Sequence, residues 1–116
     1  MRKLILTLAV ILASPTVLCA GQFQPYKIVP GRSYYSNEYK TSNGVSELGA
    51  EKNFEEVYQH YNYYEAIFDS QERIEQFKAY KRGAIEFSET YFYDGDGRPV
   101  RKEVQNADGS KSVIEF

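Results

Sequence analysis

His60 is the only histidine among the 116 residues of the chain, so any catalytic triad or histidine-ligated metal site would have to use it. The sequence contains neither a Gly-x-Ser-x-Gly nucleophile elbow nor a His-Glu-x-x-His motif, which would supply the partners that such a histidine needs. We interpret His60 as an exposed residue at the junction of two elements. We therefore predict no catalytic residue and a protein that is not an enzyme.

The spacing Asp94-x-Asp96 resembles the start of a calcium-binding loop. Such a loop needs oxygen ligands at its third, fifth and twelfth positions and glycine at its sixth. Here Arg98 takes the fifth position, Pro99 the sixth and Gln105 the twelfth. Because a guanidinium would repel a cation, we interpret the segment as a hairpin turn and predict neither a metal site nor a cofactor.

Paired carboxylates leave one enzymatic alternative open. Glu55 and Glu56 are adjacent, Glu86 and Glu89 lie three residues apart, and two suitably spaced acids can hydrolyse a glycosidic bond. With 16 acidic residues in a short chain some pair is always close, and nothing distinguishes one pair from another. A small glycosidase-like hydrolase is therefore an alternative and not the leading hypothesis.

Tyrosine is the most suggestive residue type for binding. All 11 Tyr and 7 Phe follow residue 20, and Tyr offers flat, amphipathic contact area. Consecutive residues of a strand point to opposite faces, so Tyr63 and Tyr64 cannot both be buried in a sheet with one covered face. We predict a surface for a protein, peptide or glycan; the alternative is that both faces are covered. Its candidate residues are Tyr58, Tyr61, Tyr63, Tyr64, Tyr91 and Tyr93.

A sheet must position most of these tyrosines. From Tyr61 onward apolar and polar residues alternate as strands require, with one predicted face formed by Ile85, Phe87, Tyr91 and Tyr93. Two segments that end in glycine, 94–97 and 106–109, mark tight turns between the strands.

One helix is predicted, from Ser46 to Gln59. Ser46 or Ser42 would cap it, and its acidic residues Glu47 and Glu51 come early, where the helix dipole favours them. Its apolar residues recur at three- and four-residue spacing, which would place them on one stripe. They are Ala50, Phe54, Val57, Tyr58 and Tyr61. We expect this stripe to cover the apolar face of the sheet.

The segment from Ser70 to Gly83 carries contradictory signals. Its ends are typical of a helix, with Ser70 as a cap and Gly83 as a stop. Two segments 25 positions apart, residues 67–73 and 92–98, however, resemble each other. Each has an aromatic residue followed by Asp, and an Arg four positions after that Asp. Such a period is typical of repeated supersecondary units, here hairpins. We therefore predict a strand in this segment, with a helix as the alternative.

Residues 91–98 read Tyr-Phe-Tyr-Asp-Gly-Asp-Gly-Arg, and Asp108-Gly109 follows. This order resembles the Tyr-x-Tyr-Asp-x-x-Gly-Arg…Asp-Gly pattern of YD (Rhs-type) repeats, and the chain is similar to small exported bacterial proteins of uncharacterised function built from such hairpins. The resemblance covers residues 63–116 and implies antiparallel hairpins. Glu72 stands where the second copy has Gly97, which predicts another type of turn there, or a helix. Two copies cannot enclose a toxin as the shells of large Rhs proteins do.

The first twenty residues have the order of a secretory signal. Arg2 and Lys3 precede an apolar run that is too short to span a bilayer, and small residues follow near Ala20. We predict cleavage after Ala20 and a periplasmic or secreted protein without a transmembrane segment; an uncleaved anchor is the alternative. A lipoprotein is disfavoured because Leu18 precedes Cys19, where lipoprotein processing requires a small residue.

The predicted mature chain keeps 16 acidic residues and 12 of the 14 basic ones, since Arg2 and Lys3 leave with the signal. A net-acidic chain without a basic stripe is a poor nucleic-acid binder. Residues 21–45 form an irregular lead-in, within which a short edge strand from Ser33 to Thr41 ends at the turn Asn43-Gly44. Residues 46–116 form the domain.

The predicted fold is mainly β: an antiparallel β-meander of four to six strands with one helix packed on it. The predicted function is binding, through an aromatic sheet face or an edge strand, by a small exported protein. Besides the hydrolase, an immunity or secretion-accessory protein is an alternative.

Overall fold

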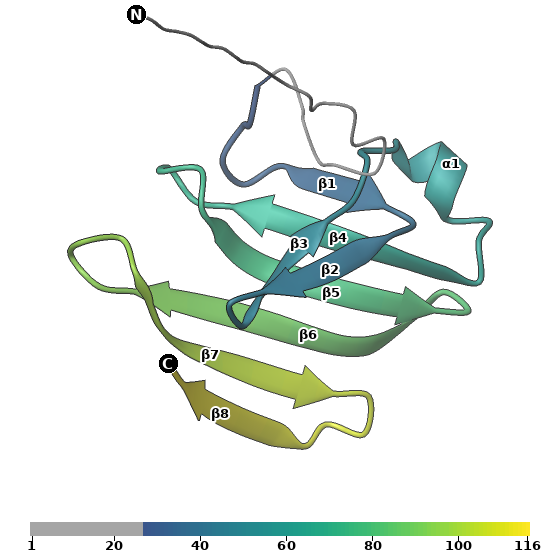
Figure 1. The fold of residues 1–116 in the computed structure, drawn as a ribbon. Helices are drawn as coiled ribbons and strands as arrows, with labels where there is room; N and C mark the ends of the chain where they lie inside the picture. The colour runs from purple at the N-terminus through teal and green to yellow at the C-terminus, as the bar shows by residue number, and fades with distance from the viewer. Residues whose placement is uncertain (1–26) are drawn as a thin grey trace, which may run out of the picture.

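The structure, a computed structural model, describes residues 27–116 and consists of a six-stranded antiparallel sheet, a two-stranded hairpin and one short helix (Figure 1). The predictions for residues 1–26, which include the signal, the cleavage after Ala20 and the absence of a lipid anchor, lie outside the described residues. None of the helices within residues 27–116 is long and apolar enough to cross a membrane.

The sheet has the strand order β1-β4-β5-β6-β7-β8, with every neighbouring pair antiparallel. Its strands are β1 (Ser33–Ser36), β4 (Asn62–Phe68), β5 (Ile74–Lys81), β6 (Ala84–Tyr93), β7 (Pro99–Asn106) and β8 (Lys111–Glu115). The last five form a meander, and the mainly β, antiparallel fold class is confirmed. Strand β5 lies inside the contested segment from Ser70 to Gly83, so the strand prediction is confirmed there.

Matching turns join β4 to β5 and β6 to β7. In each five-residue turn the first amide donates to the last carbonyl and the fourth amide to the first carbonyl, over Asp69–Arg73 and over Asp94–Arg98. The φ angle is +64° at Glu72 and +82° at Gly97. The prediction of a different turn type at Glu72 is therefore wrong. The Asp69 carboxylate accepts the amides of Gln71 and Arg73, which stabilises the turn although Glu72 has a side chain.

Replacing Glu72 with Gly will raise the free energy of unfolding by about 0.5–1 kcal/mol, because glycine accepts a positive φ that costs other residues about 1–2 kcal/mol but loses more entropy on folding. Urea denaturation measures the change. The matched variant Gly97→Ala in the second turn should lower the free energy of unfolding. A less stable Glu72→Gly protein would contradict the assignment of strain to this position.

A hairpin covers one face of the sheet; it comprises β2 (Tyr39–Ser42) and β3 (Val45–Leu48), and we call it the covering hairpin (Figure 1). Asn43 and Gly44, at its turn, have φ angles of +53° and +82°, as a type I′ turn requires. A Cβ atom on Gly44 would lie 2.9 Å from the exposed ring of Phe116, which would have to shift, so the positive φ is the main reason for glycine there.

The predicted helix from Ser46 to Gln59 is wrong in extent. Ser46 lies in β3, where it and Leu48 are buried and Glu47 is exposed, so this part has the period of a strand. Only α1 (Phe54–Val57) is helical, and Asn53 caps it in a reciprocal capping box with Glu56. The Asn43-Gly44 turn folds residues 45–48 back onto β2, and the bridge between Lys52 and Tyr35 then leaves only residues 53–61 before β4.

Residues 27–45 contain two strands where we predicted one short edge strand. The chain bends after Ser36, whose hydroxyl accepts the amide of Glu38, and this bend separates β1 from β2. Strand β1 pairs with β4 at the sheet edge, and β2 belongs to the covering hairpin.

The hydrophobic core lies between the sheet and the covering hairpin. Its buried members are Tyr34, Leu48, Ala66, Phe68, Ile74, Phe77 and Tyr91. Ile85 was predicted on the same face as Phe87, but the pairing of β5 and β6 shifts by one residue between them. This irregularity brings Ile85 opposite Tyr80, on the other face, where it is exposed.

Candidate binding surface

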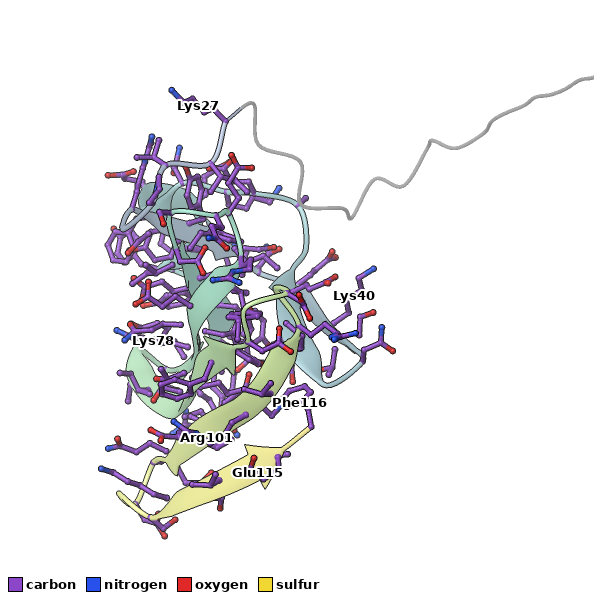
Figure 2. The ribbon with its side chains drawn as sticks, turned by 90° about the vertical axis from the view of Figure 1, so that its left-hand side faces the viewer. Lys27, Lys40, Lys78, Arg101, Glu115 and Phe116 are labelled. Atoms are coloured by element: carbon purple, nitrogen blue, oxygen red, sulfur yellow. The ribbon has the colours of Figure 1, made fainter. Side chains whose placement is uncertain are left out.

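The sheet has one face covered by the hairpin and one that we call the open face. In Figure 2 the hairpin stands on one side of the sheet with Lys40 pointing away, and Lys78 points away on the opposite side. The register places Tyr35, Glu65 and Lys78 on the open face. Among the described residues outside the sheet, Phe54 of the segment that contains α1 makes the ring contacts with this face, on Tyr35 and Tyr63. The open face is exposed toward β8, at Glu103, Gln105 and the whole of β8, whereas Tyr63 and Glu65 of β4 are buried.

Five aromatic residues form a continuous row at the β1 end of the open face. The row consists of Tyr58, Phe54, Tyr35, Tyr63 and Tyr80. The rings of Tyr63 and Tyr80 stack across β4 and β5 with centroids 4.7 Å apart. Phe54 packs on Tyr35 at 5.4 Å and stacks with Tyr58 at 5.3 Å. Phe54 and Tyr58 are 44% and 52% exposed, so they form the accessible end of the row.

A buried carboxylate fixes the inner end of this aromatic row. Glu65 accepts hydrogen bonds from the hydroxyls of Ser33 and Tyr80, the latter at 2.7 Å. Burial and the hydrogen bond to Glu65 raise the pKa of Tyr80 well above its usual value. The phenol therefore keeps its proton to a higher pH than a free tyrosine, and its hydrogen bond to Glu65 holds the ring in position.

The structure divides the six predicted tyrosines among three places. Tyr58 and Tyr63 belong to the aromatic row. Tyr64 and Tyr91 lie under the covering hairpin, and Tyr93 packs against the core and donates to the carbonyl of Ile74 at 2.6 Å. Burial and the nearby negative charge of Asp69 raise the pKa of Tyr93 to about 12. Tyr64, Tyr91 and Tyr93 therefore pack in or against the core and are not part of the aromatic row on the open face.

Tyr61 lies apart from the others, beside the β5–β6 turn. It lines an open groove of about 540 Å³ together with the following residues: Lys81, Arg82, Ala84, Ile85, Glu86 and Ala107. The charged groups of Lys81 and Arg82 lie 5.8 and 5.3 Å from the centroid of its ring. The groove contains a single carboxylate and is wide open, so it lacks the acid pair that a glycosidase needs.

Three members of the aromatic row are absent from the predicted group: Phe54, Tyr35 and Tyr80, the last of which joins the row by stacking on Tyr63. Phe54 was assigned to a helical stripe facing the sheet, and Tyr35 to the irregular lead-in. The pairing of β1 with β4 and the bridge between Tyr35 and Lys52 bring them together. The alternation of Tyr34 and Tyr35 was the one signal available, since it places one of the two on each face of a strand.

A second polar network holds the covering hairpin on the sheet. The carboxylate of Glu89 accepts the hydroxyls of Ser46 at 2.7 Å and Tyr91 at 2.6 Å, and the ammonium of Lys102 at 3.2 Å. Lys102 also donates to the carbonyl of Gly44. Burial and the bond to Glu89 raise the pKa of Tyr91 well above its usual value. The network therefore ties β3 to β6 and β7.

The carboxylates considered for chemistry lie on α1, where Glu55 and Glu56 are adjacent, in the groove and under the covering hairpin. Glu56 is engaged in the α1 capping box, while Glu86 is exposed in the groove and Glu89 is buried under the hairpin. The Asp94 carboxylate accepts the amides of Asp96 and Arg98, and these bonds lower its pKa. In residues 27–116 no group of three or more metal-binding side chains is present.

The fold and the surface together define a class: a small antiparallel β-sheet protein with one face closed by a hairpin and an aromatic row on the other. The chain belongs to a family of unknown function, DUF6156, which matches residues 39–116. That match spans the covering hairpin, α1 and strands β4 to β8. No curated protein and no solved structure matches the chain.

Proposed function

We propose that this protein is a small exported binding protein without catalytic activity, and that the open face of its sheet binds a partner protein. The order of the first twenty residues supports export. We also propose that its hairpins are related to YD repeats. The matching turns at Asp69–Arg73 and Asp94–Arg98 support this relation.

The observation that carries the proposal is the exposed end of the aromatic row. Phe54 and Tyr58 expose about half of their surface although they stack on each other and Phe54 also packs on Tyr35 and Tyr63. Exposed aromatic rings held rigidly are typical of the residues that dominate protein interfaces. The two exposed rings do not line the groove beside Tyr61, which favours a protein over a small ligand, since small-ligand sites are concave. Glu55, exposed beside these rings on α1, favours a partner with basic residues at the rim of the contact.

Affinity capture from envelope and culture extracts tests the proposal. The double variant Phe54→Ala/Tyr58→Ala should lose the partner that the wild-type protein retains. Each buried aromatic anchor contributes about 2 kcal/mol to binding, which corresponds to a roughly 30-fold loss of affinity for each ring. The matched control is Val100→Ala, which shortens an exposed apolar residue of β7 outside the aromatic row.

Partners recovered equally by the double variant and the control would contradict the proposed surface. A glycan array separates the two ligand classes. If the protein binds a glycan on the array and captures no partner from the extracts, its ligand is a glycan and not a protein. Hydrolysis of a glycan by the wild-type protein would favour the hydrolase alternative.

A further inference from the structure

Strand β8 is an unpaired edge of the sheet. Within residues 27–116 it pairs with β7 on one side, and no described strand lies on its other side. All five of its residues are exposed, and Val113 at its centre is 57% exposed. At the opposite edge, the amide of Lys52 donates to the carbonyl of Tyr35 on β1. Natural edges are usually blunted by a bulge, a proline, a covering loop or charged side chains, and among the described residues β8 has only the last of these, in Lys111 and Glu115.

The backbone groups that β8 presents outward belong to alternate residues. The amide of Phe116 donates to the carbonyl of Val100, and the amide of Asn106 to the carbonyl of Ser110. The hydrogen-bonded pairs of β7 and β8 therefore use the even-numbered residues of β8. The N–H and C=O groups of Lys111, Val113 and Glu115 consequently point away from the sheet and can pair with another strand.

The charges of β8 are symmetric about Val113. Lys111 lies two residues before it and Glu115 two residues after it, and all three side chains point to the open face. If a second copy of β8 runs antiparallel with Val113 opposite Val113, each Lys111 lies opposite the Glu115 of the other copy. Opposite charges at directly facing positions stabilise an antiparallel pair, and like charges destabilise it.

Within one chain, Glu115 also faces Arg101 of β7. Pairing two copies in this register would therefore produce a row of alternating charges across the junction: Lys111 of one copy, then Glu115 and Arg101 of the other. The other face brings each Ile114 opposite a Ser112. The register thus satisfies both the backbone groups and the charges.

We propose that two copies of this chain associate through antiparallel pairing of β8 with β8, with a two-fold axis at Val113. The three outward-facing residues of each strand then form hydrogen-bonded pairs with the other copy, and the two six-stranded sheets become continuous. The occupant of this edge is a second copy, because the charge pattern of β8 is complementary to itself. The two-fold axis runs perpendicular to the sheet, so both open faces lie on the same side.

Sedimentation equilibrium of the full chain over a range of concentrations tests this association. The wild-type protein should approach twice the mass of a single chain as the concentration rises. Lys111→Glu should weaken the association about tenfold, because two attractive pairs become two repulsive ones at the junction. The exchange Lys111→Glu/Glu115→Lys should restore it, since the opposite charges face each other again.

A second variant keeps the test independent of charge. Val113→Pro removes an outward amide that β7 does not use, and proline is tolerated on edge strands. It should abolish the dimer and leave the circular dichroism of the sheet unchanged, whereas the control Val113→Thr should still dimerise. A wild-type protein that stays monomeric at all concentrations would overturn the proposal. So would a dimer that persists in Val113→Pro, or one that Lys111→Glu leaves unaffected.

Discussion

Replacing Glu89 with Ala will lower the free energy of unfolding by about 3–5 kcal/mol, the cost of removing one partner of a buried ion pair. The Glu89 side chain accepts two hydroxyls and the Lys102 ammonium, and both residues of the ion pair are buried. Without the carboxylate, the charge of Lys102 stays buried with only the carbonyl of Gly44 as its acceptor among these groups. Urea denaturation measures the loss.

A matched control tests whether the loss of stability comes from the burial of the ion pair and not from the loss of a negative charge alone. Glu103→Gln removes an exposed acid of β7 that lies 3.7 Å from Arg101, and it should change the free energy of unfolding by less than about 1 kcal/mol. The covering hairpin offers a local measurement. In Glu89→Ala the amides of residues 39–48 should exchange hydrogen faster, and those of β4 and β5 should keep most of their protection. Equal losses for the two variants would mean that the buried network does not hold the hairpin.

Replacing Phe77 with Ala will lower the free energy of unfolding by a similar amount, about 3–5 kcal/mol, because it leaves a cavity in the core. Phe77 is fully buried in β5, and its ring lies 5.3 Å from that of Tyr39 and 6.0 Å from that of Tyr64. Phe77 therefore packs between Tyr39 of β2 and Tyr64 of β4, and it helps to join the centre of the sheet to the covering hairpin. Thermal or urea denaturation measures the change.

Two control variants set the scale for the effect of Phe77→Ala on the free energy of unfolding. Phe77→Leu keeps an apolar side chain of nearly the same volume and should cost less than about 1.5 kcal/mol. Ile85→Ala shortens an exposed residue of β6 on the open face and should change the stability by about 0.5 kcal/mol. If Phe77→Ala costs no more than Ile85→Ala, the core does not lie under the covering hairpin.

The meander could be predicted because its signals are local. The alternation of apolar and polar residues from residue 61 onward depends on neighbours in sequence, and so do the turns at Asp94–Gly97 and Asn106–Gly109. Strand β5 could be predicted because the turn before it resembles the turn after β6 in sequence. The extent of α1 could not be predicted in this way. Ala50, Phe54 and Val57 have helical spacing, but Ser46 forms its bonds with Glu89 and Tyr91, which lie 43 and 45 residues away.

The surface was predictable only in part for the same reason. The sequence requires Tyr63 and Tyr64 to face opposite sides, but it does not say which side the covering element takes. With a helix expected as the cover, Tyr91 was counted as a surface candidate, although Ser46 of the hairpin buries it. Tyr35 and Phe54 meet only because β1 returns to the edge of β4.

The covering hairpin has a consequence for the order in which the chain folds. Strands β4 to β7 each pair with the next strand in sequence, whereas the hairpin is joined to the sheet by bonds between residues more than forty positions apart. Because distant contacts close more slowly than local ones, we expect the meander to form first and the hairpin to dock afterwards. The nascent sheet then exposes its core residues to water until docking is complete. The rate of that last step sets how long the unfinished chain is vulnerable to aggregation.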